Sequence, residues 1–232
     1  MDIAGLNMYD TLLRLPLFQG MGQEDLAQVV GHTRFEFSRY KRHDILFQEG
    51  EMCRGLTFLT KGLLTTIHTS DNRQLEVREQ LPAPTVLQPE SLFGLTQRYS
   101  MTIIASSEHC DTLSISKEEV NRLLGTFELF RTSLLNIIST QAQRRSHLPW
   151  RTRPHSIREK IVRFIIDHCQ YPAGAKDIRI RMQSLATEIG ESRLNVSRVL
   201  HAMASESLLE MSREHIHIPR LEDMFGNTSA NS

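Results

Sequence analysis

The segment 182–200, MQSLATEIGESRLNVSRVL, constrains the fold of this chain more than any other stretch. Leu185 and Ile189 lie four residues apart on one face of a predicted helix, and Gly190 stands where that helix must end. Ser192 can cap a second helix by accepting a hydrogen bond from a backbone N–H two or three residues further on. The spacing therefore predicts two helices joined by a tight turn, as in the helix-turn-helix motif that reads DNA.

The second predicted helix turns a polar face outward. Val196 and Val199 are expected to pack against the first helix, which leaves the opposite side of the second helix exposed. Arginine and asparagine side chains on such a face suit the base edges and phosphates of a major groove. The expected DNA-binding residues are Ser192, Arg193, Leu194, Asn195, Ser197 and Arg198. The alternative is a helical hairpin that only packs within the protein.

A second signal follows directly after this helix. Apolar residues flank a polar turn within 208–218, and the alternation HIHI at 215–218 has the period of two that is typical of a strand. A short hairpin after a recognition helix indicates a winged helix. Its turn would bring Arg213 and His215 near the phosphate backbone, unless the hairpin is purely structural.

Charge is distributed unevenly along the chain. The whole sequence holds 27 Lys and Arg and 27 Asp and Glu, so its formal net charge is zero. Residues 141–220 hold 14 basic and 8 acidic side chains, and the remainder holds 13 basic and 19 acidic ones. A basic C-terminal part on an acidic body is the asymmetry expected when one part of a protein meets phosphate.

Composition narrows the remaining classes. The 232 residues are 40% hydrophobic and 23% charged, which is ordinary for a globular protein. The three cysteines, Cys53, Cys110 and Cys169, lie far apart, so we expect neither a disulfide framework nor a metal site. Without a leader-like N-terminus or an apolar run of roughly 20 residues, the chain is expected to be cytoplasmic and free of membranes. No GxGxxG, P-loop, GxSxG or HExxH pattern occurs, so an enzyme is not expected.

Upstream of the basic part, helical periodicity up to about Gly31 gives way to many short β-prone runs between Thr33 and Ile115. Gly, Pro and Asn-rich turns separate these runs, which favours an antiparallel sandwich or barrel. A long helix is predicted at 126–149. Its apolar stripe has the three- and four-residue steps of a coiled coil. We expect this stripe to form a homodimer seam, although a helix packed on its own barrel needs the same pattern. The seam residues are Phe127, Phe130, Leu134, Ile137, Ile138 and Gln141.

Taken in order, these elements resemble the Crp/Fnr family of bacterial transcription regulators over nearly the whole chain. ILFQEGEMCRGLTFLTKGLLTTI, at 45–67, is similar to the family's cyclic-nucleotide-binding β-roll, and SRLNVSRVL, at 192–200, to its recognition helix. The resemblance implies an α+β fold in three parts. These are an effector-sensing antiparallel β-roll (a jelly roll) with flanking helices at 1–125, a dimerisation helix at 126–149 and a winged helix-turn-helix at 150–232. Pro149 and Pro154 would form the hinge before the last part.

The same resemblance implies double-stranded DNA as the ligand of a homodimer, with RNA polymerase as a further candidate partner. Arg193 and Arg198 match positions at which family members contact base or backbone. Leu194 stands where the cyclic-AMP type often has glutamate. A leucine can touch a thymine methyl group but cannot accept a hydrogen bond from a cytosine amino group.

The expected effector pocket departs from the family pattern. A cyclic-nucleotide cassette resembles Gly-Glu followed about ten residues later by Arg-Ser, in which the arginine neutralises the phosphate. Here the pairs Gln88-Pro89 and Tyr99-Ser100 occupy those places, and Glu90 and Arg98 are displaced by about one residue. A phosphate buried without its arginine would be costly. Tight binding of cyclic AMP or cyclic GMP is therefore not expected. The expected pocket residues are Gln88, Glu90, Arg98, Tyr99 and Ser100.

Other effectors stay open. No cysteine precedes Cys53, so an N-terminal iron–sulfur cluster is not expected, and no cofactor is predicted. An unidentified small molecule in the barrel, a redox thiol at Cys53 or Cys110, and no effector at all remain as alternatives. The rival to a DNA-binding regulator is a ligand-binding protein that acts through protein partners and carries a degenerate winged helix.

Overall fold

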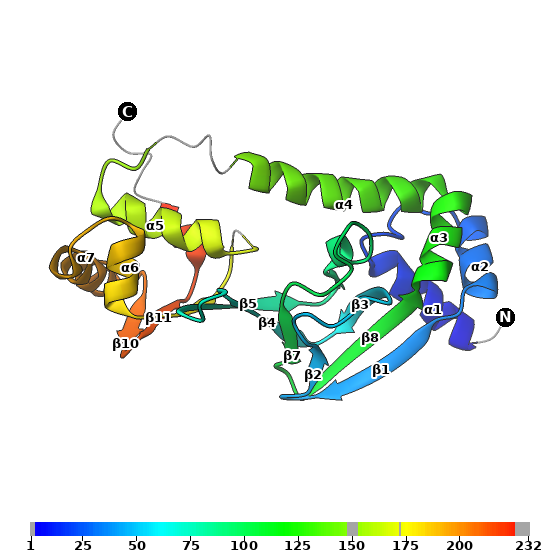
Figure 1. Cartoon of the computed structure of the whole chain (residues 1–232). Coiled ribbons are helices and arrows are strands. Elements are labelled where there is room, and N and C mark those ends of the chain that lie inside the picture. The colour runs from blue at the N-terminus through cyan, green and yellow to red at the C-terminus, as the bar shows by residue number, and fades with distance from the viewer. Residues whose placement is uncertain (1–2, 148–152, 172, 226–232) are drawn as a thin grey trace. The chain divides into compact units, whose positions relative to one another are not determined.

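The structure is a computed structural model that describes residues 3–147, 153–171 and 173–225. Its residues form two compact units, each of which combines helices with antiparallel strands (Figure 1). The first unit comprises Met1–Leu64 and Leu81–His147, and the second comprises Thr65–Gln80 and Leu148–Ser232. The predicted α+β class is confirmed. The hairpin at 65–80 groups with the C-terminal unit, and the long helix at 128–147 groups with the first unit.

The first unit contains the predicted β-roll. Its four-stranded sheet has the order β1-β8-β3-β6, and two further strands, β2 and β7, pair with each other. The strands are β1 (Glu36–Lys41), β2 (Ile45–Phe47), β3 (Gly55–Lys61), β6 (Thr85–Leu87), β7 (Thr102–Ala105) and β8 (His109–Ser116). The helices are α1 (Ile3–Arg14), α2 (Gln23–His32), α3 (Lys117–Thr126) and α4 (Glu128–His147), with a short 3-10 helix η1 (Pro89–Ser91). Among the described residues, no helix has the length and apolarity to cross a bilayer.

Close packing holds this unit together. Strand β3 runs beside β8 from Gly55, opposite Ser116, to Lys61. A Cβ atom at Gly55 would lie 2.4 Å from the Ile115 carbonyl oxygen, so only glycine allows this approach. Phe18 lies at the centre of the core, with its ring centroid 5.7 Å from that of Phe58 and 5.2 Å from that of Phe130. Phe18, which lies between α1 and α2, thereby connects β3 to α4.

The apolar stripe of α4 faces this core. Phe127, Phe130 and Leu134 are 6%, 0% and 3% exposed and belong to the cluster around Phe18. The prediction that these three residues form a dimer seam was wrong, because their own chain already covers them. Ile137 and Ile138 pack partly against the same cluster, and the side-chain oxygen of Gln141 is buried without a described partner. The stripe mainly attaches the helix to its own barrel.

The second unit contains the predicted winged helix. Its helices are α5 (Ile157–His168), α6 (Met182–Glu188), α7 (Arg193–Ser205) and the 3-10 helix η3 (Leu221–Phe225). Its strands are β9 (Lys176–Ile180), β10 (Glu210–Ser212) and β11 (His215–Ile218), joined by parts of β4 (Leu63–Thr69) and β5 (Leu75–Pro82). Of the expected hinge prolines, Pro154 precedes α5, whereas Pro149 lies outside the described residues.

Strand β5 completes the sheet of the second unit. The order is β10-β11-β9-β5, and β5 pairs antiparallel with β9 from Leu75, opposite Ile180, to Glu79, opposite Lys176. Val77 is 2% exposed and belongs to the hydrophobic core that α5, α6 and α7 form. A strand that lies about a hundred residues upstream in the sequence therefore supplies both backbone pairing and core packing to the helix-turn-helix unit.

A buried ion pair joins the same two strands. Lys176 Nζ lies 2.9 Å from Glu79 Oε1, and the two side chains are 0% and 2% exposed. The Glu79 carboxylate also accepts hydrogen bonds from the backbone N–H groups of Gln170 and Tyr171, at 2.7 and 3.0 Å. Lys176 donates a further hydrogen bond to the Ala173 carbonyl at 2.8 Å. Both charges are well satisfied, which is the condition under which a buried pair can persist.

Removing one partner should therefore cost far more than removing a surface charge. We expect Glu79→Ala to lower the free energy of unfolding of the second unit by about 3–5 kcal/mol, because Lys176 would be left buried and unpaired. Urea denaturation measures the loss, and faster hydrogen exchange in β9 would localise it. Glu76→Ala, on the same strand, removes a surface pair with Arg78 and should cost at most about 1 kcal/mol. Equal stability of the two variants would contradict the assignment.

Candidate nucleic-acid interface

The turn between α6 and α7 has the predicted geometry. Gly190 adopts a left-handed backbone conformation with φ of 67°, and the next N–H, that of Glu191, donates to the Ala186 carbonyl at 2.9 Å. The Ser192 hydroxyl accepts a hydrogen bond from the Asn195 N–H at 3.2 Å and so caps α7. Leu185 and Ala186 are fully buried at the helix crossing. Both caps and the apolar spacing are confirmed, which fixes the direction in which α7 leaves the turn.

One side of α7 is buried and the other is exposed. The inner side consists of Val196, Leu200 and Met203. On the outer side Ser192, Arg193, Leu194 and Arg198 are exposed, and the Leu194 side chain is 69% exposed. Asn195 and Ser197 were predicted to point outward and are only half-buried. The predicted set is therefore brought together on one helix, with its two arginines and Leu194 the most accessible members.

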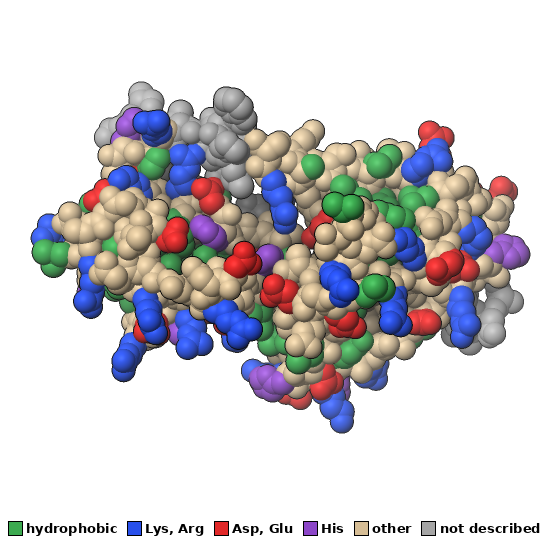
Figure 2. Space-filling model, in the orientation of Figure 1, with side chains coloured by type: hydrophobic (Ala, Val, Ile, Leu, Met, Phe, Trp, Pro, Cys, Tyr) green, Lys and Arg blue, Asp and Glu red, His purple; other side chains and the backbone are tan. Residues whose placement is uncertain are grey.

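The hairpin β10–β11 forms the predicted wing. Its turn contains Glu214 at a positive φ of 61°, flanked by the exposed residues Arg213 and His215. The Arg181 guanidinium is 74% exposed and lies 3.4 Å from the Glu214 carboxylate. In contrast, Arg193, Arg198 and Arg213 form no ion pair with any residue that the structure describes. These three guanidinium groups are thus available to an anionic ligand. Figure 2 shows Lys and Arg side chains, with acidic ones among them, on the visible face of this unit.

Sequence reasoning missed several exposed basic residues near these elements. Arg179 and Arg181 lie on and just after β9, where the alternation of buried and exposed residues turns them outward. His201 lies on α7, three residues after Arg198 and seven after Leu194, and is exposed. All three residues could have been identified from the sequence. The period-two alternation of β9 predicts that Arg179 and Arg181 point outward, and the helical period of α7 places His201 on the face of Arg198.

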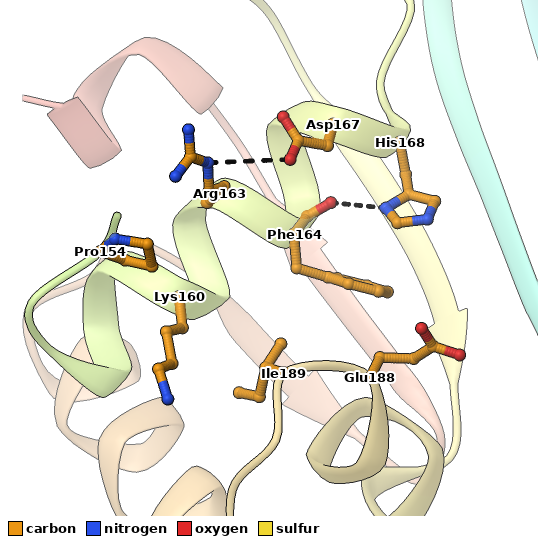
Figure 3. Close-up of a pocket in the computed structure, with 8 residues that line it drawn as sticks. All are labelled: Pro154, Lys160, Arg163, Phe164, Asp167, His168, Glu188 and Ile189. Atoms are coloured by element: carbon orange, nitrogen blue, oxygen red, sulfur yellow. Dashed lines mark hydrogen bonds and ion pairs between the residues drawn. The ribbon is translucent and has the colours of Figure 1, made fainter. Parts of the chain in front are cut away.

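A pocket of about 330 Å³ lies between α5 and the end of α6 (Figure 3). Its lysine and arginine side chains are already paired within the protein. Arg163 lies 3.9 Å from Asp167, and Lys160 lies 2.6 Å from Glu191. The His168 ring donates to the Phe164 carbonyl at 2.7 Å. Both basic and acidic side chains line this pocket, so it favours neither an anionic nor a cationic ligand.

In the first unit the predicted effector residues are only partly brought together. The Gln88 side chain is buried and spans to the segment after Tyr99. Its amide oxygen accepts hydrogen bonds from the Ser100 N–H at 2.9 Å and from the Ser100 hydroxyl at 3.1 Å. Its amide nitrogen donates to the Met101 carbonyl at 3.2 Å. Gln88 adopts a left-handed conformation with φ of 40°, so these three bonds offset a strained backbone. The donors of Ser100 are therefore already engaged by the protein.

The other three predicted pocket residues take no part in the hydrogen bonds between Gln88 and Ser100. Arg98 donates to the Gly50 carbonyl at 2.7 Å, and Tyr99 stacks on Phe47 with ring centroids 4.1 Å apart. Both carboxylate oxygens of Glu90 are buried without a described partner. The Arg98 guanidinium is exposed and donates to a backbone carbonyl, and no hydrogen bond joins it to Gln88 or Ser100 among the described residues.

Two of the three cysteines, Cys53 and Cys169, lack the features of a reactive thiol. Cys53 is buried, and burial raises the pKa of its thiol above the ordinary value. Burial likewise raises the pKa of Cys169 to about 12. Because the thiolate is the reactive form, these shifts disfavour the redox role that the sequence left open for Cys53. Among the described residues, no group of three or more His, Cys, Asp or Glu side chains could hold a metal ion.

Solved structures with the same fold are numerous. A regulator from Eubacterium rectale, assigned to the Crp/Fnr family, is 17% identical, covers 92% of this chain and 97% of its own, and has a TM-score of 0.51. The sensor domain of the transcriptional regulator DNR from Pseudomonas aeruginosa is also 17% identical, covers 66% of this chain and 99% of its own, and has a TM-score of 0.53. The Thermus thermophilus catabolite activator protein is 20% identical over 91% of this chain and 99% of its own, with a TM-score of 0.49. No curated protein matches the sequence significantly.

Two family models match the sequence and together cover most of it. The cyclic nucleotide-binding domain matches residues 37–127, which contain the β-roll and α3. The Crp-like helix-turn-helix domain matches residues 159–224, which contain the capped turn, α7 and the wing. Both matches agree with the architecture and with the exposed arginines described above. The chain belongs to the Crp/Fnr family, whose members are transcription regulators with a DNA-binding helix-turn-helix.

Proposed function

We propose that this protein is a cytoplasmic, sequence-specific transcription regulator that reads a two-fold DNA operator as a homodimer. The observation that carries the proposal is the outer face of α7. Arg193 and Arg198 are exposed there without an ion-pair partner, on a helix whose N-terminus is fixed by the Ser192 cap. RNA polymerase remains a candidate partner. The rival proposal, a regulator that acts only through protein partners, does not account for two free guanidinium groups on this face.

The side chains of α7 define what it can read. An arginine can bind the O6 and N7 atoms of guanine with two parallel hydrogen bonds, and it can also bind phosphate. Leu194 offers only apolar contact, for which the methyl group of thymine is the suitable partner in the major groove. Arg213 and His215 on the wing are placed to contact the backbone, which adds affinity without sequence information. The operator should therefore differ from that of a regulator with glutamate at this position.

Selection of bound duplexes from a random DNA library tests this proposal. The wild-type protein should enrich a two-fold site whose half-sites lie about one helical turn apart. Arg198→Ala should weaken binding to that site by about 1–3 kcal/mol, since a base or phosphate contact is lost. Arg39→Ala removes an equal charge from an exposed ion pair with Asp111 in the first unit and should leave DNA binding unchanged. If no duplex is bound even at low salt, the protein-partner proposal gains instead.

The homodimer needs an exposed face of α4, which the buried residues Phe127, Phe130 and Leu134 do not offer. Leu135 is 56% exposed, and Ile138 and Ala142 follow it at steps of three and four along α4. Ile138 is half-buried and Ala142 is exposed. This spacing is that of a coiled-coil seam, and it lies beside the stripe that packs on the barrel. We propose Leu135, Ile138 and Ala142 as the contact between two copies.

Leu135→Asp should therefore give monomers, because a carboxylate would be buried at the seam without a partner. Sedimentation velocity should show at least about a tenfold rise in the dissociation constant of the dimer, and operator binding should fall with it. Asn136→Asp adds the same charge one position further along the exposed part of α4 and is the matched control. A Leu135→Asp protein that stays dimeric at the concentration of the wild type would refute this seam.

We further propose that the effector is not a cyclic nucleotide, or that there is none. Support comes from Gln88, whose amide oxygen already accepts from the N–H and hydroxyl donors of Ser100. A bound phosphate would have to displace this buried side chain, and Arg98 would have to turn from the Gly50 carbonyl to reach it. Displacement without replacement of these bonds opposes binding.

Calorimetric titration should accordingly detect no micromolar binding of cyclic AMP or cyclic GMP to the full-length protein. The physical reason is that Gln88 occupies the Ser100 donors and that Arg98 is bonded elsewhere, because a desolvated phosphate needs a cation or several donors to offset its loss of water. The DNA-binding activity of the same preparation, measured in parallel, controls for correct folding. A saturable heat signal with a micromolar dissociation constant would overturn this part of the proposal.

A further inference from the structure

His201 lies on the exposed face of α7 that the proposed function assigns to DNA. It follows Arg198 by three residues and Leu194 by seven, so all three side chains project from the same side of the helix. Buried neighbours of α7, Val196, Leu200 and Met203, lie on the opposite side. The inference therefore rests on the proposed function, and it concerns a residue that the helix-turn-helix motif itself does not single out.

The imidazole of His201 is held in one orientation by the helix. Its Nδ1 atom lies 2.7 Å from the backbone carbonyl oxygen of Ser197 and 3.4 Å from the Ser197 hydroxyl. A carbonyl oxygen can only accept, so Nδ1 must carry the proton in this bond. In the neutral ring the other nitrogen, Nε2, is then an acceptor. The bond to Ser197 thus both fixes the tautomer and presents the Nε2 lone pair away from the helix.

This acceptor complements the three most accessible side chains of the face, Arg193, Leu194 and Arg198. The guanidinium groups of Arg193 and Arg198 can only donate hydrogen bonds, and Leu194 neither donates nor accepts. In the major groove the base-edge donors are the exocyclic amino groups of adenine and cytosine. We infer that His201 reads one of these amino groups through Nε2, and so supplies the acceptor that Leu194 lacks.

The position of His201 along α7 fits such a contact. Seven residues of helix rise about 10 Å, which corresponds to about three base pairs along the duplex. Base-reading side chains of helix-turn-helix proteins are spread over about two turns of the recognition helix. His201 should therefore read a base about three positions from the one that Leu194 touches, within the same half-site.

The test compares base preferences, because a base contact and a phosphate contact differ there. Duplexes are selected from a random library with the full-length wild type, His201→Ala and His201→Lys, and each enriched site is then measured by competition. The wild type should prefer adenine or cytosine at one position of each half-site. His201→Ala should lose at least about fivefold of that preference while other positions keep theirs. His201→Lys should shift it toward guanine, since an ammonium group can only donate.

Ser205→Ala is the matched control, because Ser205 is exposed one turn further along α7. Its base preferences should equal those of the wild type. An unchanged profile for His201→Ala would overturn the inference, and so would an equal loss of affinity on all sequences with a shallower salt dependence, which indicates a phosphate contact. In both cases the wild-type site would still support the proposed function. If the wild type enriches no site, the proposed function fails, and the role of His201 fails with it.

Discussion

Glu79 and Lys176 form an ion pair that water does not reach, and the second unit is built around it. Among the ion pairs of the described residues, it alone has both side chains less than 10% exposed. Lys176 lies on β9, the strand that leads into α6, while Glu79 also holds the backbone at Gln170 and Tyr171 after α5. One carboxylate therefore links β5, β9 and the loop that joins α5 to β9. The helix-turn-helix is held in place because β5 supplies the backbone pairing along one side of β9.

Local signals were sufficient to predict the helix-turn-helix. Gly190, the Ser192 cap and the spacing of Leu185 and Ile189 each act within a few residues, so the sequence alone reveals them. The pairing of β5 with β9 could not be predicted this way. Leu75-Glu76-Val77 is a β-prone run like several others. Its residues do not indicate which strand it pairs with, and the actual partner lies about a hundred residues away. The burial of Lys176 and Glu79 could not be predicted either, because charged side chains usually lie at the protein surface.

The stripe of α4 shows a second limit of sequence reasoning. A coiled-coil seam and a helix face packed on its own barrel both need apolar residues at steps of three and four, so the pattern could not choose between them. The structure places Phe130 and Leu134 in the core around Phe18, where both side chains are buried by the same unit. At Gln88 the pattern indicated a departure from the family. Only the structure shows the physical basis of this departure, which is the left-handed backbone of Gln88 and its hydrogen bonds to Ser100.

The hairpin at 65–80 has a consequence for how this protein can be divided. The chain passes between the two units three times, at 64–65, 80–81 and 147–148, and not once at a single linker. The helix-turn-helix family model begins at residue 159 and so omits Val77 and Glu79. A chimaera joined at the segment before Pro154 would inherit Lys176 without its carboxylate and a core without Val77. Exchange of DNA specificity between such proteins, in the laboratory or in evolution, must therefore carry the hairpin along or replace the buried lysine at the same time.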